Sequence, residues 1–440
     1  MSSSRVARAL GKHFNLNDDE NLDVPVEETP IGEGVDGAAV ETSEATELVE
    51  AENNDIEQLV EDHENLEKVA GALEESVADG QAGISEEAAK WARLAVDNII
   101  GKYGLTDEAM PSMENFGGAS TRTRATVLTL ESVRTIIAEF WKTIWAKIQK
   151  LWAYIKNWWL KVVDAAPRLK KSAEALIVRA RGLTGVAKEG PIKAGLSGLL
   201  VGGAAPDMGK EMGRLVTLSA EMMRGNEAQG KTIERLIARV ESGAKGEEDA
   251  KAAMESYKAF VEKLPHDASS RFGANVLAKM SDELPGGKAV VAKVPKDYNA
   301  KLSQLATEYG ANLTTFAEKA SEGGKDVEFK VLSSTEIQAV ASDVIKLCDA
   351  IIDYKKLWSE RDALAKKLND AVKKAEADAD KGTGEGASKD GAVIKDVAQA
   401  AAIIWKNEMA RASEFINYLI KTGRDALSYG EKSAAQYGKK

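Results

Sequence analysis

Cysteine, proline and long apolar runs are scarce in this sequence, and each shortage excludes a class of protein. The single cysteine, Cys348, excludes an internal disulfide framework and fits a reducing compartment. Only nine prolines and 6% aromatic residues occur in 440 residues, which favours helix. No stretch of about 18 apolar residues is present, so we expect no transmembrane helix of ordinary length. Residues 1–10 also lack the apolar run of a secretory signal.

Residue sets that carry chemistry are missing as well. The three histidines, His13, His63 and His266, are scattered, and none has the spacing to Cys or carboxylates that metal ligands show. The stretch Gly209-Lys210-Glu211 comes closest to a phosphate-binding loop but has Glu where Ser or Thr is required. Cys348 lies on an apolar helix face, so we expect a buried structural thiol. We therefore expect no enzyme, no metal and no cofactor.

Charge is abundant, and it is divided unevenly along the chain. Residues 1–114 hold 28 acidic and 7 basic residues, a net charge of −21, whereas residues 115–193 hold 15 basic and 5 acidic residues, a net charge of +10. Residues 194–440 carry 37 of each sign, so the whole-chain value of −11 averages three regimes. Such asymmetry is typical of an interaction tail. We expect three domains with these bounds: an acidic segment, a basic helical segment and a mostly helical domain.

The acidic segment is expected to begin without stable structure. Residues 15–55 are rich in Asp, Glu, Asn and Gly, so they cannot bury enough apolar surface to offset the entropy of ordering. A helical pattern appears from Glu41 to about Leu73. A second helix is predicted after Ser85, whose hydroxyl is suited to cap a helix that opens with Glu86-Glu87.

The basic segment contains the most distinctive predicted helix. Five of the eight tryptophans of the chain fall between Trp141 and Trp159. Apolar residues recur every three or four positions from Ile136 onward, which predicts a long amphipathic helix that starts near Thr129. We expect Pro167 to interrupt it, because proline removes a helical hydrogen bond.

The remainder of the chain predicts a helical bundle. Helices are expected near residues 207–242, 246–264, 268–282, 296–322, 334–377 and 390–436. One short strand is expected at 327–332, with Ser333 or Ser334 capping the next helix. A flexible tract over 378–386 separates the last two helices, so they should form an antiparallel hairpin. The expected fold class is all-α, with a disordered acidic leader, a long Trp/Lys-rich helix and a multi-helix domain that ends in this hairpin.

The tryptophan-rich helix has three interpretations. Its stripe can be the core-facing side of a bundle helix. Its indoles can enter a membrane surface, with lysines flanking them. Its basic residues can neutralise the phosphates of nucleic acid, and one helix can do this while it packs by its stripe. The candidate residues for DNA or membrane contact are Arg122, Arg124, Lys142, Lys147, Lys150, Lys156, Lys161, Arg168, Trp141, Trp145, Trp152, Trp158 and Trp159.

The net charge changes sign at Ser112-Met113-Glu114-Asn115. These residues lie in a predicted irregular link between Tyr103 and Ser120, and a protease needs such an exposed segment. A small residue two positions before a glutamate resembles the cleavage pattern of prohead proteases of large tailed bacteriophages. The same pattern occurs elsewhere, for example at Ala72-Leu73-Glu74. Only Ser112-Met113-Glu114 coincides with the charge reversal. The candidate scissile bond is therefore Glu114–Asn115.

Several segments are similar to internal head proteins of large contractile-tailed bacteriophages. They are Ala72-Leu73-Glu74-Glu75-Ser76, Ile84-Ser85-Glu86-Glu87-Ala88-Ala89, the link Ser112 to Gly118, Thr129 to Ser132 with the helix that follows, and Leu427 to Tyr437. The resemblance covers roughly residues 60–165 and 405–440. It implies a protein that assembles inside the procapsid, is cut by the maturation protease and stays in the virion with the packaged DNA. Residues 1–114 would then be its propeptide.

The resemblance also implies partners and a location. The partners would be the prohead protease, the capsid shell or other internal head proteins, packaged double-stranded DNA, the host membrane after ejection, and further copies of the chain. The location would be the capsid interior, after assembly in the host cytoplasm. Two alternatives stay open: a membrane-active protein that is ejected and acts on the host envelope, and a scaffold or core protein that is lost on maturation.

Overall fold

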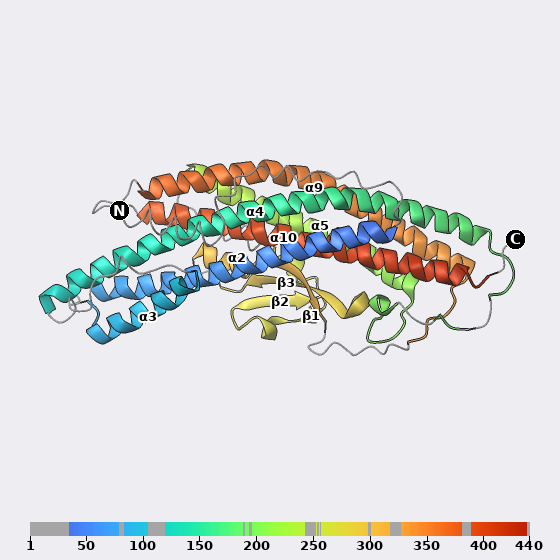
Figure 1. Cartoon of the computed structure of the whole chain (residues 1–440), viewed down its shortest axis with the longest axis horizontal. Coiled ribbons are helices and arrows are strands. Elements are labelled where there is room, and N and C mark those ends of the chain that lie inside the picture. Colours follow the sequence, from blue (N-terminus) through green and yellow to red (C-terminus); the bar gives the residue numbers. More distant parts are fainter. Residues whose placement is uncertain are drawn as a thin grey trace. The chain divides into compact units, whose positions relative to one another are not determined.

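The chain divides into two compact, mostly helical units. The computed structural model (Figure 1) describes residues 35–78, 83–103, 119–187, 190–192, 196–242, 252, 255, 257–297, 301–316, 327–380 and 389–437. The described part of the first unit lies within Ala51–Leu151. That of the second unit lies within Trp152–Lys440 and in the short stretch that ends at Glu50.

The first unit is built from three helices. They are α2 (Val35–Val77) from Ala51 onward, α3 (Glu86–Lys102), and α4 (Ala119–Arg181) up to Leu151. Ser85 caps α3 as predicted, because its Oγ accepts a hydrogen bond of 3.1 Å from the N–H of Ala88. The acidic first turn of α3 also faces the positive end of the helix dipole.

The helix α2 begins earlier than the sequence suggested. It starts at Val35, so the disorder that we expected over residues 15–55 does not extend to residues 35–55, and residues 15–34 lie outside the described part. Ile56, Leu59 and Leu66 are buried along α2. Packing of these side chains stabilises a helix whose acidic composition alone would not.

The helix α4 is also longer than predicted. It begins at Ala119 rather than near Thr129, and it continues through Pro167 to Arg181, a length of 63 residues. The predicted interruption is therefore wrong. Proline removes one intrahelical hydrogen bond, but Ala165, Ala166 and Leu169 are buried around it. Their packing holds the helix on both sides of the proline.

Three long helices form the centre of the second unit. These helices, α5 (Met208–Ser242), α9 (Ser334–Asp380) and α10 (Lys389–Ala434), pack along one another (Figure 1). The N–H of Leu332, just before α9, donates to Ser433 Oγ near the end of α10 at 3.2 Å. Farther along, Arg361 of α9 meets Glu408 of α10. The two helices are therefore antiparallel, which confirms the predicted hairpin.

The start of α9 carries a reciprocal cap. The N–H of Glu336 donates to Ser333 Oγ at 3.2 Å, and the N–H of Ser333 donates to Glu336 Oε2 at 2.8 Å. This capping box confirms Ser333 as the cap. Cys348, farther along α9, is buried, and burial raises the pKa of its thiol to about 12. Its burial agrees with the buried structural thiol that we predicted.

A buried ion pair joins the three central helices. Nε and one terminal nitrogen of Arg361 donate to Glu408 Oε1 at 3.0 and 2.6 Å, and the same terminal nitrogen donates to the carbonyl of Asn226 in α5 at 2.7 Å. The Arg361 side chain is 5% exposed and that of Glu408 is 0% exposed. Gly230 of α5 lets the guanidinium approach, because a side chain at this position would collide with it. Sequence reasoning did not identify this group.

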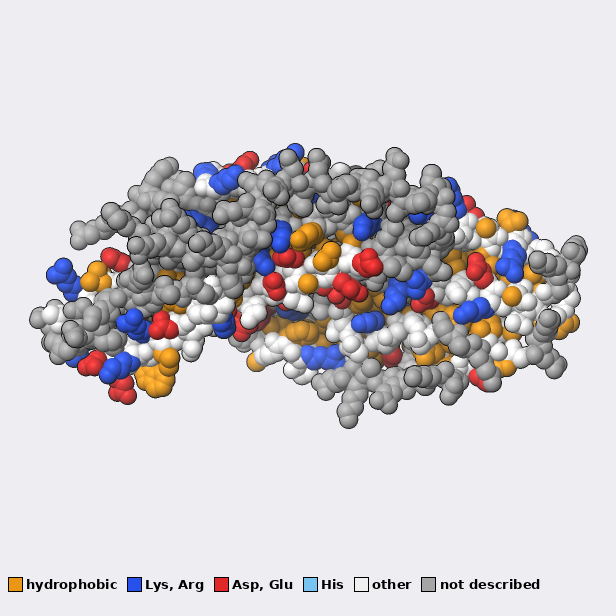
Figure 2. All heavy atoms as spheres, viewed as in Figure 1, with side chains coloured by type: hydrophobic (Ala, Val, Ile, Leu, Met, Phe, Trp, Pro, Cys, Tyr) orange, Lys and Arg blue, Asp and Glu red, His pale blue; other side chains and the backbone are white. Residues whose placement is uncertain are grey.

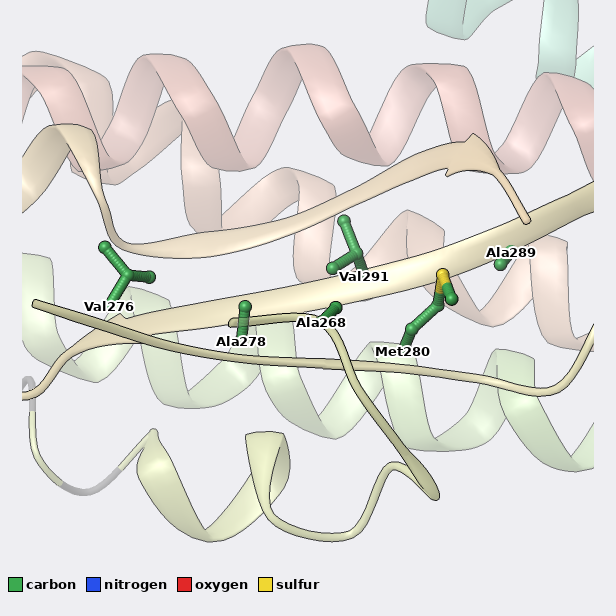
Figure 3. Close-up of a cluster of buried hydrophobic side chains, with 6 residues drawn as sticks. All are labelled: Ala268, Val276, Ala278, Met280, Ala289 and Val291. Atoms are coloured by element: carbon green, nitrogen blue, oxygen red, sulfur yellow. The ribbon is translucent and has the colours of Figure 1, made fainter. Parts of the chain in front are cut away.

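A small antiparallel sheet completes the second unit. Its order is β1 (His266–Asp267), β2 (Val276–Met280), β3 (Lys288–Pro295) and β4 (Gly310–Thr315). β3 pairs with β2 from Val291 to Pro295 and with β4 from Lys288 to Lys293. Side chains from β2, β3 and the turn after β1 form one buried cluster (Figure 3): Ala268, Val276, Ala278, Met280, Ala289 and Val291.

Two predicted helices are replaced by this sheet. Residues 268–282 and 296–322 were expected to be helical, but they contain β2 and β4, and α8 (Leu302–Thr307) is the helix described there. In β2 the buried residues alternate with half-buried ones, which is the period of a strand. Asp396 of α10 caps α8, because its carboxylate accepts from the N–H groups of Leu302 and Ser303 at 2.8 and 3.1 Å.

Two further predictions changed. Within 246–264 the described helix is α7 (Lys258–Val261), and most of the predicted range before it lies outside the described residues. The strand expected at 327–332 is reduced to one bridge, in which Phe329 pairs with Ile192. Both N–H···O bonds of the bridge form, at 2.8 and 3.1 Å, but no strand among the described residues extends them.

The absence of a side chain at Gly430 of α10 lets Leu176 of α4 pack closely against α10 in the second unit. A Cβ at Gly430 would lie 2.8 Å from Leu176 Cδ2 and 3.6 Å from Ile337 Cγ2. We therefore expect Gly430→Val to destabilise the unit by about 1–3 kcal/mol through overpacking. The matched control is Gly213→Val in α5, where a Cβ meets only Asp343 Oδ2 at 4.0 Å. Urea unfolding of both variants measures the difference, and equal losses would contradict the close packing at Gly430.

Candidate functional site

The five clustered tryptophans of α4 lie in the core. None of Trp141, Trp145, Trp152, Trp158 and Trp159 is more than 9% exposed. Apolar residues three or four positions apart place them on one stripe, and that stripe is the buried side of the helix. The structure therefore supports the core interpretation of the stripe. Contact of these indoles with DNA or a membrane would first require that α4 be uncovered.

The candidate basic residues differ in exposure. Lys147 is buried and Arg122 is half-buried, whereas the others are exposed: Arg124, Lys142, Lys150, Lys156, Lys161 and Arg168. Several of the exposed cations have acidic partners, such as Glu139 for Lys142 at 3.1 Å and Asp362 for Lys156 at 2.6 Å. On the face shown in Figure 2, basic and acidic side chains are interspersed rather than gathered by sign.

Acidic residues of α2 pair with basic residues of α4 in the first unit. Lys147 Nζ lies 3.0 Å from Asp55 and 3.5 Å from Glu52, and Lys150 lies 3.2 Å from Glu52. Glu52 and Asp55 are three positions apart, so they share one side of α2. The leader is thus bound to the basic helix by specific ion pairs.

A fourth ion pair lies farther along the same two helices. Arg134 of α4 meets Glu74 of α2 at 3.0 Å, and both side chains are more than half exposed. An exposed pair adds little stability, about 0–1 kcal/mol. This pair does show that acidic residues of α2 meet basic residues of α4 near the C-terminal end of α2 as well as at Glu52.

A buried carboxylate ties the end of α3 to α2. Asp62 accepts from Lys102 Nζ at 2.8 Å and from the Tyr103 hydroxyl at 2.7 Å. Burial, together with this carboxylate, raises the pKa of the Tyr103 hydroxyl. The Tyr103 ring in turn packs edge-on against Phe140 of α4, with ring centroids 5.1 Å apart. Asp62 therefore connects all three helices of the unit, directly or through Tyr103.

Two more contacts join the leader to α4. The ring of His63 in α2 lies 5.9 Å from that of Trp141. At the entry to α3, the N–H of Ile84 donates to Thr126 Oγ1 at 3.2 Å. Gly83 is needed there, because its φ is +78° and a Cβ would lie 2.7 Å from the same hydroxyl oxygen.

Sequence reasoning found the helices of this unit but not their pairing. The apolar pattern of α2 was a usable signal, since Ile56, Leu59 and Leu66 are buried, and an amphipathic helix needs a partner. The pairing of Glu52 with Lys147 spans 95 positions and leaves no local mark in the sequence. The leader therefore meets the basic helix through apolar packing as well as through ion pairs.

The proposed cleavage residues lie outside the described part of the chain. Ser112, Met113, Glu114 and Asn115 fall in residues 104–118, for which the structure gives no account. Among the described residues, no helix has an apolar stretch that could cross a membrane, and no cluster of His, Cys, Asp and Glu is arranged to hold a metal ion.

A comparison with models of known protein families gives a match. Residues 43–432 match the family of phiKZ-like phage internal head proteins. Neither curated proteins nor solved structures gave a match. The matched range includes α3, α4 and most of α2, as well as most of the second unit. The family places the protein inside the virion capsid, in association with capsid components. Because the match covers most of its length, the chain belongs to the phiKZ-like phage internal head proteins.

Proposed function

We infer that the chain is made as a precursor and is cut after Glu114 by the prohead maturation protease. Residues 115–440 then stay in the capsid with the packaged DNA and act there as a structural protein rather than an enzyme. The observation that carries this proposal is the reversal of charge at the candidate bond, from −21 before it to +10 over residues 115–193, in a chain of an internal head family.

The charges suit a change of partner on cleavage. With residues 1–114 attached, the net charge of −11 opposes binding to DNA. Loss of those residues leaves residues 115–440 at +10. Exposed cations such as Arg124, Lys161 and Arg168 are then the proposed phosphate contacts, and binding should weaken as salt is raised.

The two alternatives are less well supported. A membrane-active helix presents its indoles to the lipid interface, whereas the five clustered indoles of α4 are buried. A scaffold that leaves on maturation would need no basic remainder, and membership of an internal head family favours retention. Purified mature particles without this protein would support the scaffold alternative.

The Glu114→Gln substitution, introduced into the phage, tests the cleavage proposal. We expect the chain in the resulting particles to keep its full length of 440 residues. The matched control, Glu108→Gln, changes the same charge in the same link and should leave cleavage intact. Gel mobility and intact mass of the particle proteins provide the readout. If the Glu114→Gln particles contained a shortened chain of the same mass as that in unsubstituted particles, cleavage at this bond would be contradicted.

A further inference from the structure

We propose that the side of α4 facing α2 and α3 is a binding surface for an acidic amphipathic helix, and that the chain's own leader occupies it until cleavage. The inference rests on the proposed cut after Glu114. We call residues 51–103 the cover. The covered face is drawn from the buried or ion-paired residues of α4 in the same unit and includes Val133, Arg134, Ile136, Ile137, Phe140, Trp141, Ile144, Trp145, Lys147, Ile148 and Lys150.

The covered face is apolar along its centre. Phe140 and Ile144 are 0% exposed, and in the first unit the described elements beside α4 are α2 and α3. The cover brings its own buried apolar residues to this unit: Ile56, Leu59, Val60, Leu66, Leu73, Val96, Ile99 and Ile100. Loss of the cover would open the centre of the face to water, so the uncovered face needs a new apolar partner.

The face carries three cations that pair with acids of the cover, and these cations define the charge of the partner. Lys147, Lys150 and Arg134 meet Asp55, Glu52 and Glu74 of the cover. The Lys147 side chain is only 9% exposed, so a partner without a carboxylate at this point would bury an uncompensated cation. An occupant must therefore combine an apolar stripe with flanking acids, as α2 does.

Two other occupants fit less well. A second copy that used the same face would set Lys147 and Lys150 against the same cations of its partner. Duplex DNA would satisfy the cations but would leave the rings of Phe140 and Trp141 without apolar contact. Charge and hydrophobicity together favour an acidic amphipathic helix, which other internal head proteins or further leaders can supply.

Cleavage makes the occupant exchangeable. In the uncut chain the cover is tethered to the face, which corresponds to an effective concentration of roughly millimolar. A cut within residues 104–118 removes this tether without disturbing any contact described above. An external helix then competes with a cover that no longer has the advantage of the tether. The cut therefore makes the face accessible to other helices without altering the residues of the face.

The test uses the full chain with a site for an added sequence-specific protease placed in residues 104–118. A fluorescent peptide of residues 51–103 is the probe, and binding is followed by anisotropy before and after the cut. We expect the peptide to bind the cut chain and displace the leader, with at least about tenfold weaker binding to the uncut chain. Size-exclusion chromatography detects the displaced leader.

Matched peptides separate specific pairing from overall charge. Glu52→Lys with Asp55→Lys should weaken binding at least about tenfold, and Lys147→Glu in the chain should restore much of it. Glu61→Lys with Glu75→Lys makes the same change in net charge at exposed positions and should have less than about a twofold effect. Equal binding of the two variant peptides would overturn the proposal, as would displacement of the leader by duplex DNA but not by the peptide.

A second measurement guards against loss of folding. Amide hydrogen exchange of the cut chain on dilution should rise most in α4 up to Leu151 and change less in α5, α9 and α10, because only the leader stretch that ends at Glu50 belongs to the second unit. An equal rise in all four helices would overturn the proposal, because the leader would then support the whole fold. Since the added protease makes the cut, this test does not depend on natural cleavage. A full-length chain in mature particles would refute the proposed function while the binding result stood.

Discussion

Replacing Arg361 by methionine should lower the free energy of unfolding of the second unit by about 3–5 kcal/mol. The variant keeps much of the side-chain volume but leaves the carboxylate of Glu408 buried without its partner, and leaves the carbonyl of Asn226 without this donor. Few surface substitutions approach this size. Urea unfolding followed by circular dichroism measures the effect.

The loss should grow with pH. Burial raises the pKa of Glu408, and Arg361 opposes that rise, so the substitution raises this pKa further. A carboxyl whose pKa is higher in the folded state contributes stability below its unfolded pKa of about 4.3, and this contribution is lost as pH rises through the folded pKa. The Arg361→Met variant should therefore be more strongly destabilised at pH 8 than at pH 5.

Two controls define the result. Lys346→Met removes the ion pair between Lys346, whose side chain is 60% exposed, and Asp343. This substitution should lower the free energy of unfolding by about 0–1 kcal/mol. Arg361→Met combined with Glu408→Leu removes both charges and should recover most of the loss. A similar cost for Arg361→Met and Lys346→Met would show that the pair is not buried in solution.

Replacing Trp158 by alanine should cost about 3–5 kcal/mol, because its side chain is fully buried beside Trp159. The neighbour Leu160 is 67% exposed, so Leu160→Ala should change the stability by less than about 0.5 kcal/mol. Chemical unfolding of both variants tests whether the tryptophan stripe packs in the core. If Trp158→Ala were as harmless as Leu160→Ala, the indole would be at the surface, as the membrane interpretation requires.

Local signals in the sequence predicted local structure. Ser85, and Ser333 or Ser334, were predicted as helix caps because a hydroxyl before an acidic first turn satisfies free N–H groups within three residues, and the structure shows Ser85 and Ser333 in this role. The stripe of α4 was read from spacing alone, and its tryptophans are buried as the core interpretation requires. The hairpin of α9 and α10 followed from two long apolar patterns joined by a short flexible tract.

Long-range pairing was not predictable in the same way. Arg361 and the carbonyl of Asn226 are 135 positions apart, and nothing near either residue announces the other. The sheet was missed because its strands are short, and Leu277, Ala278, Lys279 and Met280 of β2 are residue types that also favour a helix. The predicted break at Pro167 does not occur, because the packing of α4 outweighs the loss of one helical hydrogen bond.

The contacts between the leader and α4 could not be read from the charge pattern of the sequence. In the sequence, the charge reversal at Glu114 marked only a candidate scissile bond between an acidic and a basic segment. The described contacts add that the leader packs on that helix, through Tyr103 against Phe140 and through the ion pairs of Lys147. Cleavage would therefore release both a charged and an apolar surface inside the capsid.

The most direct test of the proposed function is the intact mass of this protein from purified mature particles. We predict a chain that begins at Asn115 and lacks the 28 acidic residues of the leader. N-terminal sequencing of the same band should read Asn-Phe-Gly-Gly. A chain of all 440 residues in those particles would contradict the account.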